Sequence, residues 1–593
     1  MTEQYQADYD VVVVGFGGAG ATAARFAADN GAKVLIVETA PYGNEGGNTR
    51  YSAQLIGTGE DFDEAKTYYL NLTKPLSLPE DMVDTFVHGM VNMRKYVKDY
   101  LDVEPFSMEH DDNPFNLQTA IHEFPEYEGN ETYDFTTVHK GLFDAALWKI
   151  LRQKVLDRKD NIDVWLSSRA RHLIQNPETK KIEGVVVERD GKEVKVLARK
   201  GVVLALGGFE NNPELQQNYL GAPKLSPLGT IYNRGDGIKM AAEVGAKLWH
   251  MYNYESLGMM HGLSFDTDNE RSVLYLGSEK INHGSVFVVT DDGKRYFNET
   301  EPNRHGHIFD HGAWRVPRTH EHTYLVFDQK QYDEMKERGL GTEKLEDFDK
   351  LLVKADSLRE LAEKIGVNAD NFEHTVKQFG EFAENGEDVL YGRDPESMRA
   401  FGEGPYYGVK LIYNVLNTQG GPERNTHAEI LDNNNEPIPH LYGAGELGGI
   451  CANEYQGGGN LAECLIFGKI AGENVAKVED EVNGTSTGEL NGINDLADGE
   501  NQKITLKDHQ YLGSSNRGLG GKVTVRVTYD SGKIENVEVV EEHESEDVAK
   551  HALKEMPEKI VAANSVEVDA VSGASSTSNA IREAVSDALS KAR

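Results

Sequence analysis

Cysteine is scarce in this sequence, which holds Cys451 and Cys464 and no other in 593 residues. Their spacing is not C-x-x-C, and two thiols argue against a disulfide framework, a zinc site and an iron–sulfur cluster. We therefore expect no metal centre, and we expect both cysteines to pack in the protein core.

Positive charge is also in deficit. Lysine and arginine number 61 against 98 aspartates and glutamates, which gives a formal net charge of −37. Such a surface repels phosphate backbones and anionic lipid, so nucleic-acid and membrane partners are excluded. A small-molecule substrate stays open, because a local basic pocket can lie inside an acidic surface.

Long apolar runs are missing as well. No stretch of about 18 residues is free of charge or dense glycine, as a membrane-spanning helix would require. The N-terminal MTEQYQADYD lacks the basic start and apolar core of a signal peptide. These absences indicate a cytoplasmic protein.

Glycine, by contrast, is abundant, and its first cluster has a readable pattern. The segment YDVVVVGFGGAGATAARFAADNGAKVLIVE predicts a strand, a tight turn, a helix and a second strand, with Gly15, Gly17 and Gly20 spaced as G-x-G-x-x-G. The glycines permit the turn, the approach of a pyrophosphate and close packing of helix on strand. Glu38 ends the second strand, where a carboxylate can bind both hydroxyls of an adenosine ribose. The sequence therefore predicts a dinucleotide site, for NAD or FAD.

One composition shift marks a domain boundary. Residues 481–502 are rich in Gly, Asn, Asp, Ser and Thr and poor in large apolar side chains, which predicts a linker. About 90 residues follow, a normal size for a small separate domain.

Later glycine motifs decide between the two dinucleotides. PYGNEGGNTRYSA, GVVLALGGFENN and PHLYGAGELGG follow the first site in order. Together they resemble the FAD-binding flavoproteins of the fumarate reductase and succinate dehydrogenase superfamily, over about residues 9–473. The resemblance implies non-covalent FAD held by Gly15, Gly17, Gly20, Glu38, Gly46, Gly47, Asn48, Thr49, Ala170, Gly207, Gly208, Gly445, Glu446, Asn460 and Leu461.

The same resemblance implies the fold. We expect an α/β protein whose Rossmann-like FAD-binding domain is formed by residues 1–257 and 408–480. An α+β capping domain, residues 258–407, is inserted between these parts and covers the flavin. The linker 481–502 would then lead to a small α+β domain at 503–593.

The capping region carries the expected proton donor. DDGKRYFNETEPNRHGH resembles the family segment G-K-R-F-x-N-E followed by T-R-D, whose arginine protonates the substrate carbon. The matching residue is Arg304. An arginine can also bind a carboxylate through two hydrogen bonds. His305 stands where an aspartate is usual in the family.

Two further departures concern the substrate. Fumarate reductases hold the dicarboxylate with a histidine in H-T-M-G-G and an arginine in A-N-R-L-G-G-N, where this chain reads NTQGGPERN and ANEYQGGGNLAE. The histidine position is taken by Asn417 or Thr418, and the arginine position falls in residues 454–456. Fumarate would lose two of its principal partners, which makes it an improbable substrate.

The YQGGGN stretch instead resembles the Y-P-G-G-G of the 3-ketosteroid dehydrogenases. That resemblance implies that the Tyr455 hydroxyl and the Gly459 N–H bind a ketone oxygen and stabilise the charge that develops on it. Arg424 is a further candidate for the same oxygen, and we assign His261, His305 and Arg424 to substrate binding.

The C-terminal 90 residues resemble a second flavin module. GLGGKVTVRVTYDSGKIENVEVVEEHE alternates across a DSG turn and predicts a hairpin, and IREAVSDAL places Ile581, Val585 and Leu589 on one helical face. Between them, DAVSGASSTS matches the D-x-x-[ST]-G-A-[ST]-x-[ST] signature of the small FMN-binding domain of sodium-pumping quinone reductases. The match implies FMN joined as a phosphoester to Ser575 by a flavin transferase. The signature positions are Asp569, Ser572, Gly573, Ala574, Ser575 and Thr577.

These observations lead to one hypothesis and several alternatives. The hypothesis is a flavin-dependent ene-reductase, an oxidoreductase acting on CH–CH groups, for an aryl acrylate, urocanate or an enone, with electrons relayed through FMN. The alternatives are a 3-ketosteroid dehydrogenase or reductase, a fumarate reductase, and a flavin electron carrier or redox sensor without its own substrate. The electron donor is either a separate NAD(P)H:flavin reductase or NAD(P)H itself. The sequence leaves the substrate, the direction of reaction and the oligomeric state open.

Overall fold

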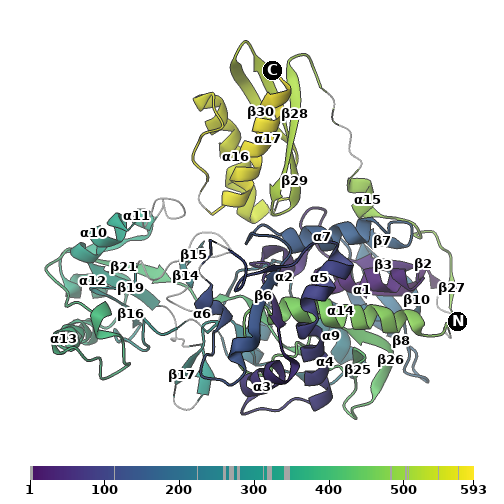
Figure 1. The fold of residues 1–593 in the computed structure, drawn as a ribbon, viewed down its shortest axis with the longest axis horizontal. Helices are drawn as coiled ribbons and strands as arrows, with labels where there is room; N and C mark the ends of the chain where they lie inside the picture. The colour runs from purple at the N-terminus through teal and green to yellow at the C-terminus, as the bar shows by residue number, and fades with distance from the viewer. Residues whose placement is uncertain are drawn as a thin grey trace.

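The computed structural model describes residues 4–592, with gaps at 113, 116, 223–224, 258–261, 266–272, 277–280, 303, 311–312, 317–322, 339–347, 481, 483, 501–503, 505, 545 and 572. Three parts are visible in Figure 1: a large α/β part that holds the N-terminus, a smaller part at one end, and a compact C-terminal part that lies on the large one.

The large part is built on an eight-stranded sheet. Its main path runs β25-β26-β10-β2-β3-β7, with β8 and β9 extending β10 as antiparallel strands. Residues 11–13 of β2 and all four of β3 are fully or almost fully buried, as expected for parallel strands covered on both faces. The bounds are β2 (Ala7–Val14), β3 (Val34–Val37), β7 (Ile162–Trp165), β8 (Arg169–Gln175), β9 (Ile182–Arg189), β10 (Lys192–Leu204), β25 (Glu429–Leu431) and β26 (Pro437–Gly443).

Two helices from opposite ends of the sequence pack together on this sheet. They are α1 (Gly18–Asp29) and α14 (Gly459–Lys477). Glycines in α14 allow close contact: a Cβ at Gly468 would lie 2.8 Å from the Ala19 carbonyl oxygen, and one at Gly472 would clash with the Ala23 carbonyl. The middle of α14 therefore lies against the first turns of α1.

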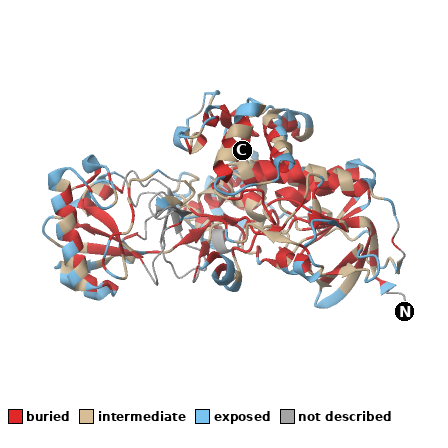
Figure 2. Ribbon diagram, turned by 90° about the horizontal axis from the view of Figure 1, so that it is seen from below, coloured by how far each residue is buried: buried red, intermediate tan, exposed pale blue. Residues whose placement is uncertain are grey.

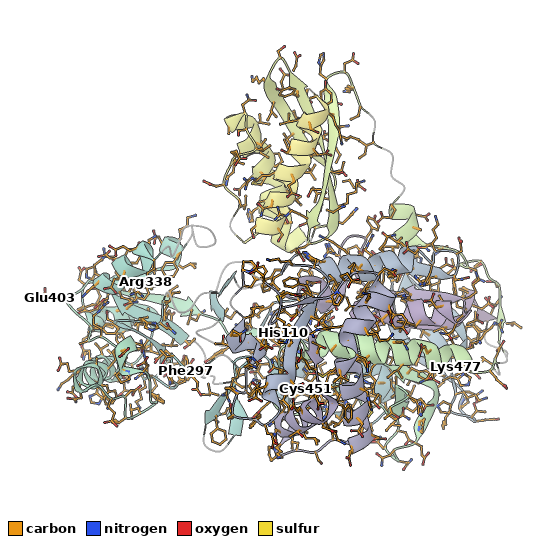
Figure 3. The ribbon with its side chains drawn as sticks, viewed as in Figure 1. His110, Phe297, Arg338, Glu403, Cys451 and Lys477 are labelled. Carbon is orange, nitrogen blue, oxygen red and sulfur yellow. The ribbon has the colours of Figure 1, made fainter. Side chains whose placement is uncertain are left out.

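The smaller part falls mostly in the region expected as a capping domain, but its last strand ends at Leu411 and not at residue 407. Its six-stranded sheet runs β15-β14-β21-β19-β16, with β20 also paired to β21. Helices α12 (Leu358–Ile365) and α13 (Ala369–Asn385) cover one face, where Phe287, Phe372 and Phe379 are buried. Figure 3 labels Phe297, Arg338 and Glu403 in this part. The strands are β14 (Gly262–Phe265), β15 (Val273–Leu276), β16 (Val286–Thr290), β19 (Thr323–Asp328), β20 (Val353–Ala355) and β21 (Tyr406–Leu411).

The segment expected as a linker is largely bound to the large part. β27 (Thr485–Ser486) pairs with β1 (Gln4–Tyr5), and Leu496 of α15 (Asp495–Gly499) is fully buried. The Asp495 carboxylate accepts two hydrogen bonds from Arg189, at 2.7 and 2.9 Å. The polar side chains of this segment thus bind to the large part, and the composition of the segment alone does not predict that contact.

The C-terminal part is an antiparallel sheet with two helices. β28, β29 and β30 lie in chain order, and the DSG turn joins β29 to β30, which confirms the predicted hairpin. Ile581 and Val585 of α17 are fully buried against β29, as the sequence predicted. The elements are β28 (Gln510–Gly518), β29 (Gly521–Asp530), β30 (Lys533–Glu541), α16 (Glu546–Ala563) and α17 (Ser575–Lys591).

Burial follows this division. Figure 2 shows buried residues inside each of the three parts and exposed residues on their outer helices. Cys451, labelled in Figure 3, and Cys464 are both buried and unpaired. Among the described residues, no helix is both long enough and apolar enough to cross a membrane.

Candidate active site

A cavity of about 820 Å³ opens at the carboxyl ends of β2, β3 and β10, the edge where parallel α/β sheets bind ligands. Gly15 has a φ of +101°, and a Cβ there would clash with the Ala205 carbonyl. A Cβ at Gly20 would clash with the Gly15 carbonyl. The backbone therefore admits only glycine at these places, which keeps the turn open for a dinucleotide.

Glu38 lies on the cavity wall just past the end of β3. Its carboxylate accepts hydrogen bonds from the backbone N–H of Phe16 at 2.6 Å and of Ala40 at 2.7 Å. These donors fix the carboxylate beside the glycine turn. The size of the cavity, the turn and this carboxylate fit the adenosine end of FAD.

Most residues expected at FAD lie on this wall. A few lie behind it: Gly46 is packed against Trp148, and a Cβ at Gly208 would clash with Thr418. Gly20 holds α1 against the turn, as described above. The expected residues on the wall are Gly15, Gly17, Glu38, Gly47, Asn48, Thr49, Ala170, Gly207, Gly445, Glu446, Asn460 and Leu461.

Asn48, on the cavity wall, joins two carboxyl groups, of which Glu446 also lines the cavity and the buried Glu210 is not among the described lining residues. Its Nδ2 donates to Glu210 Oε1 at 2.9 Å and to Glu446 Oε2 at 3.0 Å. Burial raises the pKa of Glu210 to about 7 and raises the pKa of Glu446 further, with the Glu210 charge adding to it. The pair therefore holds a proton at neutral pH. Sequence reasoning missed Glu210, although the GGFENN motif contains it.

Tyr455 also lines the cavity. Its hydroxyl oxygen accepts the Asn460 N–H at 3.2 Å, in the first turn of α14. Burial raises the pKa of Tyr455 well above its usual value, so the hydroxyl keeps its proton and can donate it. The His305 ring lies edge-on to the Tyr455 ring, with centroids 4.7 Å apart.

His305 is held in an uncommon conformation, with a φ of +48°. Its Nδ1 donates to Glu123 Oε1 at 2.7 Å, since a carboxylate can only accept, and Glu123 Oε2 accepts the Gly457 N–H at 3.2 Å. Burial lowers the pKa of His305, but the Glu123 charge and hydrogen bond outweigh burial and raise it overall. The Glu123 carboxylate therefore favours the protonated imidazole at the cavity wall.

Asn417, one of two residues at the lost histidine position, also lines the cavity. Its Nδ2 donates to Glu255 Oε2 at 2.5 Å, and Gln419 Nε2 donates to the same oxygen at 2.9 Å. Burial raises the pKa of Glu255 to about 8, so this carboxyl is mostly neutral at pH 7. Among the described wall residues, His305 and Arg234 are the only cationic side chains.

Arg304 and Arg424 are not among the described residues that line the cavity. The Arg304 guanidinium donates to both Glu126 oxygens, at 2.6 and 3.1 Å, and lies over the Phe124 ring. It is not among the described wall residues. Arg424, expected at the substrate, is instead buried behind the wall, where Glu463 of α14 neutralises it.

The remaining substrate candidates are Gly459 and His261. Gly459 lines a small separate cavity on the far side of Tyr455, and its N–H donates to the Gln456 carbonyl at 3.3 Å. His261 lies outside the described residues.

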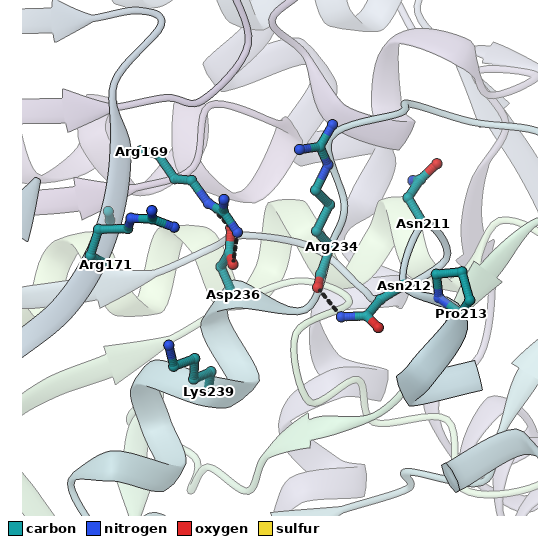
Figure 4. A pocket seen from close by; sticks show the side chains of 9 residues that line it. Arg169, Arg171, Asn211, Asn212, Pro213, Arg234, Asp236 and Lys239 are labelled. Carbon is teal, nitrogen blue, oxygen red and sulfur yellow. Dashed lines mark hydrogen bonds and ion pairs between the residues drawn. The ribbon is translucent and has the colours of Figure 1, made fainter. Parts of the chain in front are cut away.

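A second, basic pocket of about 310 Å³ adjoins the main cavity and shares Ala170, Arg234 and Asp236 with it. Figure 4 shows Arg169 paired with Asp236, and the Arg234 side chain directed away from Arg171 and Lys239. In this pocket, therefore, Asp236 neutralises Arg169, and the Arg234 side chain points away from the other basic side chains.

The proposed FMN acceptor lies at the start of α17. Ser575 is half-buried, Asp569 is exposed, and Ser572 lies outside the described residues. Thr577 is buried and donates to the Glu544 carboxylate. A reachable hydroxyl at a helix N-terminus suits a phosphoester.

Glu544 also joins the C-terminal part to the main cavity. Its carbonyl oxygen accepts a hydrogen bond from Asn44 Nδ2, a cavity-wall residue, at 3.0 Å. The adjacent His543 packs edge-on against Tyr42, and its carbonyl accepts a hydrogen bond from Arg50. One short turn after β30 therefore contacts both α17 and the cavity wall.

Comparisons with known proteins agree with this geometry. A family model described as "FAD binding domain" matches residues 10–461, and one described as "FMN-binding domain" matches residues 518–590. The chain belongs to the FAD-binding family of fumarate reductase-like flavoproteins. It is a flavin-dependent oxidoreductase with an FAD-binding and an FMN-binding domain.

The relatives act on different compounds. An NADH:fumarate oxidoreductase from Klebsiella pneumoniae is 30% identical over 494 residues, which are 79% of this chain but only 48% of that longer protein. A vinyl phenol reductase from Lactiplantibacillus plantarum is 26% identical over 506 residues, which are 80% of this chain and 97% of that protein.

Two solved structures share the fold. A 3-ketosteroid Δ1-dehydrogenase from Sterolibacterium denitrificans has a TM-score of 0.63 at 22% identity, over 79% of this chain and all of that one. An open flavocytochrome c3 fumarate reductase has a TM-score of 0.60 at 24% identity, over 79% of this chain and 78% of that one.

Proposed function

We propose that the protein reduces the C=C bond of an α,β-unsaturated carboxylate or ketone, with an aryl acrylate such as a hydroxycinnamate, or urocanate, as the preferred class. The observation that carries this proposal is the convergence of the Tyr455 hydroxyl, which burial keeps protonated, and the His305 imidazole on the wall of the FAD cavity, with their ring centroids 4.7 Å apart. When bound, reduced FAD supplies a hydride. Tyr455 then holds the substrate oxygen, on which negative charge develops.

The wall favours an aromatic substrate with at most one negative charge. Leu117, Phe135, Leu142 and Leu257 are among its apolar side chains. His305 is the basic side chain beside Tyr455 on the described wall, because Arg234 also lines the neighbouring basic pocket and Arg304 is paired with Glu126. A dicarboxylate would leave one charge without a partner. The vinyl phenol reductase among the relatives also supports an aryl substrate.

The electron supply is part of the proposal. FMN on Ser575, attached by a flavin transferase, would pass electrons to FAD. The chain then needs an outside donor, either a separate NAD(P)H:flavin reductase or NAD(P)H acting on a flavin.

The test is an anaerobic reoxidation experiment. The holoenzyme is reduced chemically, and p-coumarate, urocanate, fumarate and a Δ4-3-ketosteroid are then added separately. The absorbance of oxidised flavin at about 450 nm is followed after each addition. We expect rapid reoxidation by p-coumarate or urocanate and slow reoxidation by fumarate. Tyr455→Phe should slow it by roughly 10²–10³-fold, whereas Tyr252→Phe, whose hydroxyl bonds only to the Ala452 carbonyl among described partners, should not. Reoxidation by dioxygen alone would favour an electron carrier or sensor.

A further inference from the structure

We propose that His305, held by Glu123, donates the proton to the substrate α-carbon, and that Arg304 does not. This inference rests on the proposed reduction of an activated alkene and names the acid that completes it.

The positions of the two side chains separate their roles. His305 lines the cavity and contacts Tyr455 edge-on, whereas the Arg304 guanidinium is directed to Glu126 and Phe124. The two side chains are equally buried, at 14% exposure for Arg304 and 15% for His305, so what separates them is direction and not depth. Of these two neighbours, His305 is the one on the described cavity wall.

Glu123 fixes the orientation of the imidazole. Both of its oxygens are used, one by His305 Nδ1 and one by the Gly457 N–H, and its side chain is 2% exposed. With Nδ1 engaged, Nε2 is the nitrogen left to act, and it has no hydrogen-bond partner within the described part of the chain. Gly457 belongs to the wall beside Tyr455, so one carboxylate positions both the imidazole and the loop that carries the tyrosine.

The chemistry favours an imidazolium over a guanidinium. The alkene π bond breaks, one new C–H bond forms at the β-carbon with the hydride, and a second forms at the α-carbon with the proton from Nε2. The alkene gains the two electrons that reduced FAD loses with the hydride, and the neutral imidazole regains its proton from water. General acids work best with a pKa near the working pH, whereas guanidinium groups lie above about 12.

Single-turnover reoxidation of the reduced holoenzyme tests the assignment. With whichever alkene reoxidises the wild type, we expect His305→Gln to slow the step by roughly 10²–10⁴-fold. Arg304→Gln should slow it by less than about tenfold. If Arg304→Gln shows the large loss and His305→Gln is close to wild type, the proposal is overturned.

A second readout tests the role of Glu123 without turnover. The His305 imidazole signal is identified by NMR as the one missing in His305→Gln, and its titration is followed in wild type and Glu123→Gln. Glu123→Gln should lower the pKa of His305, and the pH at which reoxidation slows should fall with it. An unmoved titration would refute the positioning role.

The outcomes also separate this inference from the proposed function. If no alkene reoxidises the wild-type protein, the proposed function and the proton-donor role fail together, and the NMR titration still decides whether Glu123 charges His305. If an alkene reoxidises wild type and His305→Gln equally well, the function stands and only this inference fails.

Discussion

Buried carboxyl groups surround the Tyr455 end of the cavity, and at the scale of single residues they make the fold sensitive to pH. Glu255 is fully buried and held by two amide side chains, yet its pKa rises to about 8 from an ordinary 4.5. The folded state therefore holds a proton that the unfolded chain releases between these two values. Stability contributed by neutral Glu255 is fully present below pH 4.5 and is lost as the pH rises toward 8.

The wild-type protein should accordingly become less stable from about pH 5 to pH 8, by up to roughly 1.4 kcal/mol for each pH unit from this group. Glu255→Gln should flatten that dependence, because an amide has no proton to lose. Thermal unfolding midpoints at several pH values measure it. Glu436→Gln, at an exposed turn, is the control. An equally steep curve in Glu255→Gln would show that other groups cause the dependence.

Ser575→Ala should abolish covalent FMN when the protein is made together with a flavin transferase, because the phosphoester needs this hydroxyl. Ser576→Ala, at the neighbouring half-buried hydroxyl, should keep it. Intact mass and the fluorescence of the denatured protein report the attached flavin. Retention of FMN in Ser575→Ala together with its loss in Ser576→Ala would move the attachment by one residue.

Residue types were readable from motifs, but their partners were not. Gly15, Glu38 and Tyr455 belong to local patterns, and each lies on the cavity wall. Glu123 belongs to no motif and reaches His305 only because the chain folds 182 residues back on itself. The Glu123–His305 hydrogen bond orients the imidazole toward its role at the cavity wall, and the spacing of residues in the sequence does not predict that bond.

At the scale of elements, close packing between α1 and α14 depends on glycines without side chains. Gly472→Ala would place a Cβ against the Ala23 carbonyl, which is backbone and cannot turn aside. We expect a loss of roughly 1–3 kcal/mol in unfolding free energy, as for other overpacked interiors, and weaker FAD binding. Gly380→Ala in α13 is the comparison variant and should cost less, because its Cβ would lie 3.3 Å from the Ala400 Cβ, a tight contact that a small shift relieves, against 2.3 Å from the Ala23 carbonyl oxygen for Gly472→Ala.

Chemical denaturation and FAD titration measure both effects. Equal stability in Gly472→Ala and wild type would mean that the two helices separate at little cost.

Local patterns predicted the β2–α1–β3 unit, the β29–β30 hairpin and the buried face of α17, because each depends on short-range periodicity. They did not predict α15 or the β1–β27 pair, because those form only against a surface that distant strands build.

At the scale of the whole molecule, the turn after β30 connects the two flavin-binding parts. Lys149→Ala with His543→Ala should loosen this contact, because Lys149 donates to the Asn516 carbonyl and His543 packs on Tyr42. We expect FMN-to-FAD electron transfer to slow by at least about tenfold, since it depends on the two flavins approaching each other. Hydrogen exchange in residues 541–544 should increase.

Rapid-mixing absorbance on the fully flavinylated protein measures the transfer. Lys533→Ala, at the far hairpin turn, is the control. Unchanged transfer in the double variant would show that the C-terminal domain reaches FAD from another position. The motifs did not predict this contact, because Asn44 lies in the PYGNEGGNTRYSA stretch and His543 at the end of the hairpin segment, and neither pattern shows that the two segments meet.

The sheet order also has a consequence for synthesis. β10 is completed on one side by β2, near the beginning of the chain, and on the other by β26, which comes after the whole capping region. The ribosome must therefore release the capping region and β26 before the FAD cavity can close, and the early strands wait with an unpaired edge meanwhile. The C-terminal domain, which follows the FAD-binding domain in the sequence and is closed within itself, is free to fold at once. A chain interrupted after the capping region would expose the β10 edge and become a substrate for chaperones or proteases rather than a smaller flavoprotein.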